Sequence, residues 1–118
     1  MAITLVFRIP FETDLASPQM AQHLAERSGL TPTRTDDWDS QMGFRLVGET
    51  GAVHLFRETR DEPKGRPPSY EFSGTAIDGE DRQRVASLFG LCRAAVEFID
   101  GRIDEKRLID PSHSIDLP

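Results

Sequence analysis

Two short segments of alternating side chains flank a glycine-containing turn near the middle of the chain, and their pairing limits the possible folds more than any other feature of the sequence. Phe44 and Leu46 occupy alternate positions before the turn at 48–51, and Val53 and Leu55 do so after it. If Leu46 lies opposite Val53 in an antiparallel hairpin, all four side chains share one face of a sheet. A slip of one residue would distribute them over both faces, so this register is strongly favoured. We therefore expect an antiparallel sheet with one apolar face.

Three further segments are expected to be strands. Residues 2–9 alternate in the way that is typical of a half-buried strand. On its core side we place Ile3, Leu5, Phe7 and Ile9, and on its other side Thr4, Val6 and Arg8. Residues 70–77 form the last expected strand, with Tyr70 and Phe72 directed to the core, and residues 31–35 form a weaker, short one.

The first expected helix spans residues 18–28 and has a signal at each end. Ser17 is suited to the N-cap, and Pro18 to the first helical position, where its missing N–H is not needed. At the other end, Gly29 fits the left-handed position that follows a helix, with Leu30 as the apolar residue after it.

The second expected helix follows the last strand directly. Asp78 can cap its first turn, and Gly101 is placed to end it. Apolar side chains recur at spacings of three and four residues, as in a helix with one buried face. They are Val85, Leu88, Phe89, Cys92, Val96 and Ile99.

These elements predict an α+β fold in the order β-α-(β)-β-β-β-α. A mainly antiparallel sheet of four to five strands with one apolar face can bury that face against two amphipathic helices. We therefore expect a two-layer sandwich with both helices on one side of the sheet. The 118 residues correspond to one domain, which we assign to residues 1–110, followed by a frayed C-terminal tail at 111–118.

No motif in the sequence indicates a catalytic centre, a metal site or a cofactor site. His23, His54 and His113 lack the short spacings of metal ligands, and no pair of cysteines is present. Cys92 lies on the apolar stripe of the second helix, where a buried thiol is unreactive. The chain is expected to bind rather than to catalyse, with no cofactor.

The charge of the chain favours some partners over others. The formal net charge is −6, from 20 acidic and 14 basic residues. An acidic protein is repelled by nucleic-acid phosphates and by anionic membranes, and it attracts basic proteins. We therefore expect a basic protein partner. The start of the chain does not resemble a signal peptide, so we also expect a cytoplasmic protein.

Two groups of residues are candidates for partner binding. One is the sheet face opposite the helices, where aromatic and arginine side chains mix as they do in interfaces. The residues proposed there are Arg8, Arg45, His54 and Phe56. The other is a loop in which the only tryptophan, Trp38, lies among Asp36, Asp37 and Asp39. Tryptophan is a frequent hot-spot residue in interfaces.

The leading hypothesis is an intracellular protein–protein interaction module, in one form an acidic inhibitor or immunity-type protein that blocks a basic enzyme. A second is a small-molecule binding domain or minor enzyme with an anionic ligand in a pocket between sheet and helices. A third is a homo-oligomeric structural subunit that pairs through the exposed sheet face. The sequence leaves all three open.

Overall fold

The structure is a computed structural model that describes residues 3–13, 17–35, 43–47, 51–58 and 69–117. It contains two α-helices, one short 3₁₀ helix and seven strands. In chain order they are β1 (Ile3–Glu12), α1 (Ser17–Ser28), β2 (Pro32–Thr35), β3 (Gly43–Val47), β4 (Gly51–Glu58), β5 (Ser69–Ala76), α2 (Gly79–Phe98), β6 (Arg102–Ile103), η1 (Pro111–His113) and β7 (Ile115–Leu117).

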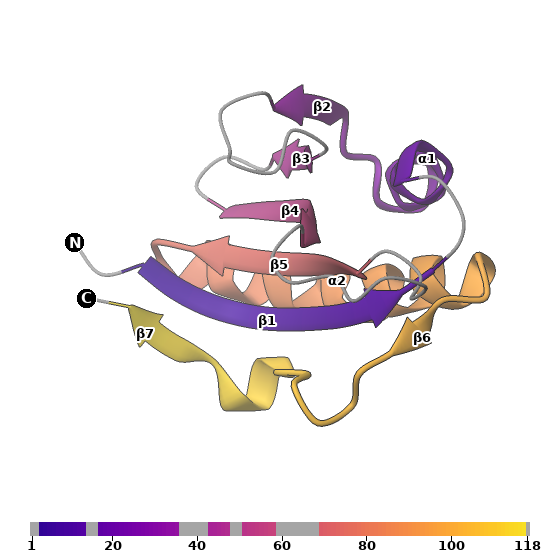
Figure 1. The fold of residues 1–118 in the computed structure, drawn as a ribbon. Helices are drawn as coiled ribbons and strands as arrows, with labels where there is room; N and C mark the ends of the chain where they lie inside the picture. The colour runs from indigo at the N-terminus through magenta and orange to yellow at the C-terminus, as the bar shows by residue number, and fades with distance from the viewer. Residues whose placement is uncertain (1–2, 14–16, 36–42, 48–50, 59–68, 118) are drawn as a thin grey trace.

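The strands form one antiparallel sheet in the order β2-β3-β4-β5-β1-β6, and β7 also pairs with β1 (Figure 1). This confirms the predicted α+β class with a mainly antiparallel sheet. The hairpin register is confirmed as well, because Leu46 lies opposite Val53 and Phe44 opposite Leu55. The weakly signalled segment at 31–35 is the edge strand β2, paired with β3.

A β-bulge in β1 overturns part of the predicted alternation. Leu5 lies opposite Thr75, yet Phe7 lies opposite Gly74, so Val6 is an extra residue in β1. Such an insertion exchanges the two faces for every residue before it. Val6 consequently joins the core at 2% exposure, whereas Ile3, which we expected on the core side, is 45% exposed.

The largest core side chains come from the neighbouring strands β1 and β5. They are Phe7, Ile9, Phe11 and Phe72, each at most 1% exposed. Burial of each contributes about 1.5–3 kcal/mol relative to exposure. The Phe11 ring stacks on both Tyr70 and Phe72, with centroids 5.6 and 5.7 Å away.

Helix α2 packs across β1, β5 and β4 and lies behind the sheet in Figure 1. The predicted cap is present, since Asp78 Oδ1 accepts a hydrogen bond of 2.8 Å from the backbone N–H of Asp81. The predicted apolar stripe meets the sheet, and the Phe89 ring packs edge-on against Phe7 with centroids 5.5 Å apart. No helix in the described part of the chain is long and apolar enough to cross a membrane.

Helix α1 packs against α2 and against the start of β2. Gly29 adopts the predicted left-handed conformation, with φ of 76°, and its N–H bonds to the Ala25 carbonyl. The His23 ring stacks on Phe98 of α2, with centroids 4.0 Å apart. This stack joins the two helices near the C-terminal end of α2.

The end of α2 differs from the expected glycine stop. Asp100, not Gly101, has the positive φ, at 54°. Gly101 instead allows a close approach, because a Cβ atom there would lie 2.6 Å from Val96 Cγ1. Its backbone N–H bonds to the Val96 carbonyl at 2.9 Å.

In place of the frayed tail expected at 111–118, residues 102–117 run along the outer edge of β1 (Figure 1). We call this segment the strap. Arg8 and Ile109 exchange backbone hydrogen bonds of 2.8 and 2.9 Å at its middle. Arg93 of α2 forms an ion pair with Glu105 of the strap. Unpaired backbone groups at a strand edge are satisfied by such pairing, which periodicity in the sequence does not reveal.

Candidate functional site

The candidate site is the face of the sheet directed away from α2, which we call the distal face. Its orientation follows from β5, where Phe72 and Gly74 point to the core while Glu71 and Ser73 point the other way. The predicted residues on the first and fourth strands, Arg8 and His54, both lie opposite Ser73. The structure therefore brings these two onto one face, as expected.

A row of four directly paired residues crosses the distal face. Arg45 of β3 lies opposite His54 of β4, His54 opposite Ser73 of β5, and Ser73 opposite Arg8 of β1. We call these four residues the distal row. The pairing of Arg45 with His54 is the one that the hairpin register predicts, whereas the role of β5 as the link to Arg8 was not evident from the sequence.

Glu71 contacts two residues of the distal row, Arg8 and Ser73. Arg8 Nε lies 3.1 Å from Glu71 Oε1, in an ion pair without hydrogen-bond geometry. The Ser73 hydroxyl donates a hydrogen bond of 2.7 Å to Glu71 Oε2. The Arg8 side chain is 42% exposed and that of Glu71 is 16% exposed. The carboxylate is therefore largely buried, whereas part of the guanidinium is accessible to a partner.

The other predicted partner-binding residues are placed only in part. Phe56 of β4 lies opposite Glu71 of β5, next to the distal row. Trp38, Asp36, Asp37 and Asp39 lie outside the described residues. The acidic tryptophan loop thus stays a prediction from the sequence.

Apolar residues that the sequence analysis did not single out gather at one end of the sheet. Ile3 lies opposite Leu117, and Leu5 lies opposite Ile115. Ile77 follows directly after Ala76, which is paired with Thr4. The exposed fractions of Ile3, Ile77, Ile115 and Leu117 are 45%, 43%, 45% and 39%. We call these four residues the apolar end.

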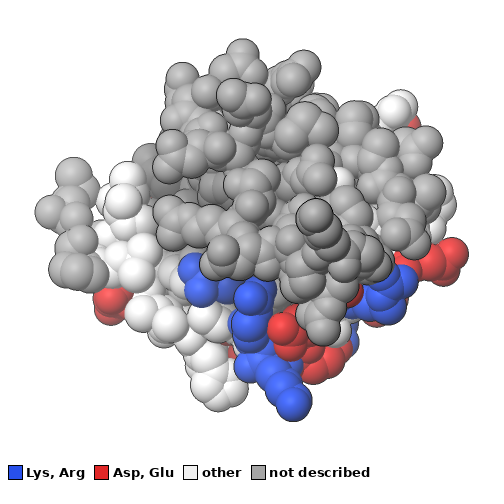
Figure 2. All heavy atoms as spheres, viewed as in Figure 1, with Lys and Arg blue, Asp and Glu red and all other residues white. Residues whose placement is uncertain are grey.

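The apolar end and the distal row belong to the same face. Leu5 and Ile115 share that face with Thr75, which lies two residues from Ser73 along β5. Two residues of strand span about 7 Å, so the two groups are neighbours. In Figure 2, uncharged side chains lie toward the β7 end of the view, and a mixture of basic and acidic side chains lies toward its middle. Only the bulge and the pairing of β7 could have revealed this patch.

Ser112, His113 and Asp110 lie together at η1, yet their geometry is that of a helix cap. Ser112 Oγ and Asp110 Oδ1 each lie 3.1 Å from the same His113 ring nitrogen, Nδ1. A catalytic triad requires the nucleophile and the carboxylate to contact different ring nitrogens. Hydrogen bonds from Ser112 and then from His113 lower the pKa of Asp110. Asp110 therefore serves as an N-cap, and it also accepts from the Ser112 backbone N–H at 2.8 Å.

Cys92 and the side chains that could ligate a metal are the other groups of chemical interest in the described part of the chain. Cys92 is fully buried, and burial raises the pKa of its thiol far above the usual value. A thiol in this state is not a nucleophile. Among the described residues, no group of three His, Cys, Asp or Glu side chains is placed to hold a metal ion.

Comparisons with known proteins returned nothing: the chain matches no protein-family model, no curated protein and no solved structure. Its function must therefore be inferred from its own residues.

Proposed function

We propose that this protein is an intracellular protein-binding module that uses its distal face. The observation that carries the proposal is the apolar end beside the distal row on a single face. Interfaces commonly combine an apolar centre with a rim of polar groups in which arginine is enriched. Four exposed large aliphatic side chains at one end of a sheet are more than the scattered apolar residues of an ordinary surface.

The expected partner is a basic protein. A net charge of −6 attracts a basic protein at long range and speeds encounter at low salt. At short range, Arg8 has an open basic side that can reach carbonyl groups or aromatic rings of the partner. In its most specific form, the proposal is that the partner is a basic enzyme and that the chain is its immunity-type inhibitor.

The proposal is tested with variants of the apolar end and a matched control. The partner is captured from a lysate at low and moderate salt, and its affinity is then measured directly against each variant. We expect Ile115→Ser with Leu117→Ser to weaken binding at least tenfold, since hot-spot side chains typically cost more than about 1.4 kcal/mol. The control is Phe98→Ser on α2, because Phe98 is apolar and 63% exposed but does not lie on the distal face. Since this change also removes the stack on His23, the stability of each variant is measured beside its affinity.

Two results would overturn the proposal. One is a partner that binds the double variant as tightly as the parent chain. The other is an equal loss in the double variant and the Phe98→Ser control. Light scattering at two concentrations of the chain alone would identify the competing case, in which the distal face pairs with a second copy.

A further inference from the structure

A cavity of about 200 Å³ lies on the other side of the sheet, between the end of α1, the first residues of β4 and the first half of α2. Because it opens on the α2 side, it is separate from the distal face. Binding at the two places can therefore be tested independently. A ligand in this cavity would be a function separate from partner binding at the distal face.

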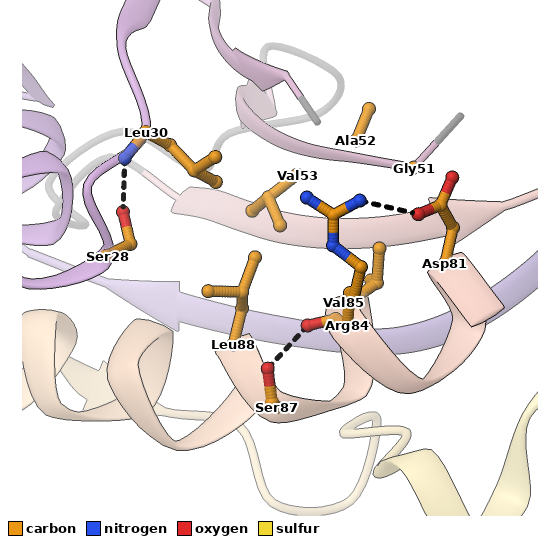
Figure 3. Close-up of a pocket in the computed structure, with 10 residues that line it drawn as sticks. All are labelled: Ser28, Leu30, Gly51, Ala52, Val53, Asp81, Arg84, Val85, Ser87 and Leu88. Atoms are coloured by element: carbon orange, nitrogen blue, oxygen red, sulfur yellow. Dashed lines mark hydrogen bonds and ion pairs between the residues drawn. The ribbon is translucent and has the colours of Figure 1, made fainter. Parts of the chain in front are cut away.

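The cavity has an apolar wall built from three elements. Leu30 follows α1, Val53 lies in β4, and Leu88 lies in α2, and the three side chains converge in Figure 3. Val53 is fully buried, while Leu30 and Leu88 are half-buried and border the open space. An apolar group that enters the cavity would therefore contact side chains that are already held by the core.

One positive group stands at the mouth of the cavity. Arg84 Nη1 donates a hydrogen bond of 3.1 Å to Oδ1 of Asp81 one turn earlier in α2. The side chain of Asp81 is 8% exposed and that of Arg84 is 54% exposed. Asp81 thus fixes the guanidinium from its buried side, which reduces the conformational entropy that Arg84 would lose on binding a ligand.

The rest of the guanidinium is directed toward the cavity. Figure 3 shows one terminal nitrogen of Arg84 bonded to Asp81 and the other turned toward the side of Leu30 and Val53. Within the described part of the chain, that second nitrogen has no hydrogen-bond partner. An arginine held in this way offers a planar donor edge to an anion.

We propose that the cavity binds a small molecule with one carboxylate and a compact apolar body. The carboxylate would accept hydrogen bonds from Arg84, and the apolar body would pack against Leu30, Val53 and Leu88. A singly charged group is favoured over a doubly charged phosphate, because the Asp81 carboxylate lies beside the guanidinium and repels added negative charge.

The volume limits the size of the apolar body. An apolar cavity of about 150 Å³ accepts benzene, and pockets for drug-sized ligands measure about 300–1,000 Å³. A cavity of about 200 Å³ therefore matches one six-membered ring or a short branched chain that carries the carboxylate.

The test is an amide NMR titration of the whole chain with benzoate, phenylacetate and 3-methylbutanoate, each paired with its uncharged amide. At least one carboxylate is expected to bind with a dissociation constant of about 1 mM or tighter and to shift the amides around Leu30, Val53 and Leu88. Its amide analogue is expected to bind at least tenfold more weakly, because the charge-assisted hydrogen bond is lost.

Two matched variants separate the arginine contact from a general effect of charge. Arg84→Gln should weaken carboxylate binding about ten- to a hundredfold. Arg82→Gln removes the same charge from an exposed position on the same helix that does not line the cavity, and it should leave affinity unchanged. The amide spectra of both variants also report whether the fold is retained.

Three results would overturn the proposal: no shifts with any of the carboxylates, shifts that map away from the cavity, or an equal loss of affinity in the two variants. None of them would affect the distal-face proposal. In the same way, a failure of partner binding would leave the cavity proposal intact.

Discussion

Phe7 of β1 lies directly opposite Gly74 of β5, and its ring occupies the space that a side chain at position 74 would need. From the other layer, Val85 Cγ1 of α2 would lie 2.7 Å from a Cβ atom added at Gly74. Because Gly74 has no side chain, Phe7 of β1 and Val85 of α2 can both pack against β5 at this position. The glycine is thus required by packing between the layers.

Gly74→Ala is therefore expected to lower the free energy of unfolding by about 1–3 kcal/mol, as overpacking does in a dense core. Urea denaturation checks this directly. The control is Gly90→Ala in α2, where a Cβ atom would meet nothing within 4 Å. It should stabilise the chain by about 0.5–1 kcal/mol through helix propensity. The two variants should therefore change the free energy of unfolding in opposite directions, and equal changes would contradict the packing of Phe7 against Gly74.

The cap of α2 gives a second prediction. Asp78→Ala should cost about 1 kcal/mol, because the N–H of Asp81 loses its side-chain acceptor. Asp78→Asn should retain most of the stability, since asparagine caps about as well as aspartate. Glu80→Ala, which removes an acidic residue from the same turn, should cost only a few tenths of a kcal/mol. Similar losses of stability for Asp78→Ala and Glu80→Ala would show that negative charge near the start of α2, rather than the capping hydrogen bond, provides the stabilisation.

The position of the strap can be tested through Thr4 and Asp116, which lie 112 residues apart in the chain. The Thr4 hydroxyl donates a hydrogen bond of 2.8 Å to Asp116 Oδ1. A double-mutant cycle with Thr4→Val and Asp116→Ala should give a coupling of about 0.5–1.5 kcal/mol in unfolding experiments. Additive effects of the two changes would indicate that the strap does not pair with β1 in solution.

The depressed pKa of Asp110 predicts a pH dependence with a defined sign. Its pKa is lowered in the folded chain, chiefly by the hydrogen bond from Ser112 and then by that from His113. The stabilisation from the cap is therefore complete above the unfolded value, about 3.9, and is lost as the pH falls through the lower folded value.

An NMR titration of the Asp110 carboxyl group should give a midpoint below the ordinary aspartate pKa of about 3.9. Ser112→Ala should move that midpoint upward, because the largest cause of the shift is removed. A midpoint at or above the usual value in the parent chain would contradict the cap geometry. So would a midpoint that Ser112→Ala leaves unchanged.

Local patterns were sufficient for the elements that form within a short stretch of chain. The register of the β3–β4 hairpin followed from the alternation of Leu46 and Val53, and the start of α2 from Asp78. Each depends on residues that are close in sequence, so periodicity and capping chemistry determine them. The candidate binding residues Arg8 and His54 were correctly assigned to one face for the same reason.

The features that failed prediction all depend on distant partners. The bulge at Val6 exchanges the faces of the start of β1, and nothing near Val6 marks it. The close approach at Gly101 depends on Val96 and also on Phe11 of β1, which is far away in the chain. The apolar end arises only when the strap brings Ile115 and Leu117 beside Ile3.

The sequence by itself determined the α+β class, the hairpin register and the start of α2 with its apolar stripe, because these follow from side-chain periodicity and local hydrogen bonding. Only the tertiary structure decided the order of the strands, the course of the strap and the cavity beside Arg84. These depend on which distant segments pair with the free edge of a strand and which distant side chains fill the space between the layers. Neither kind of contact produces a pattern among neighbouring residues in the sequence.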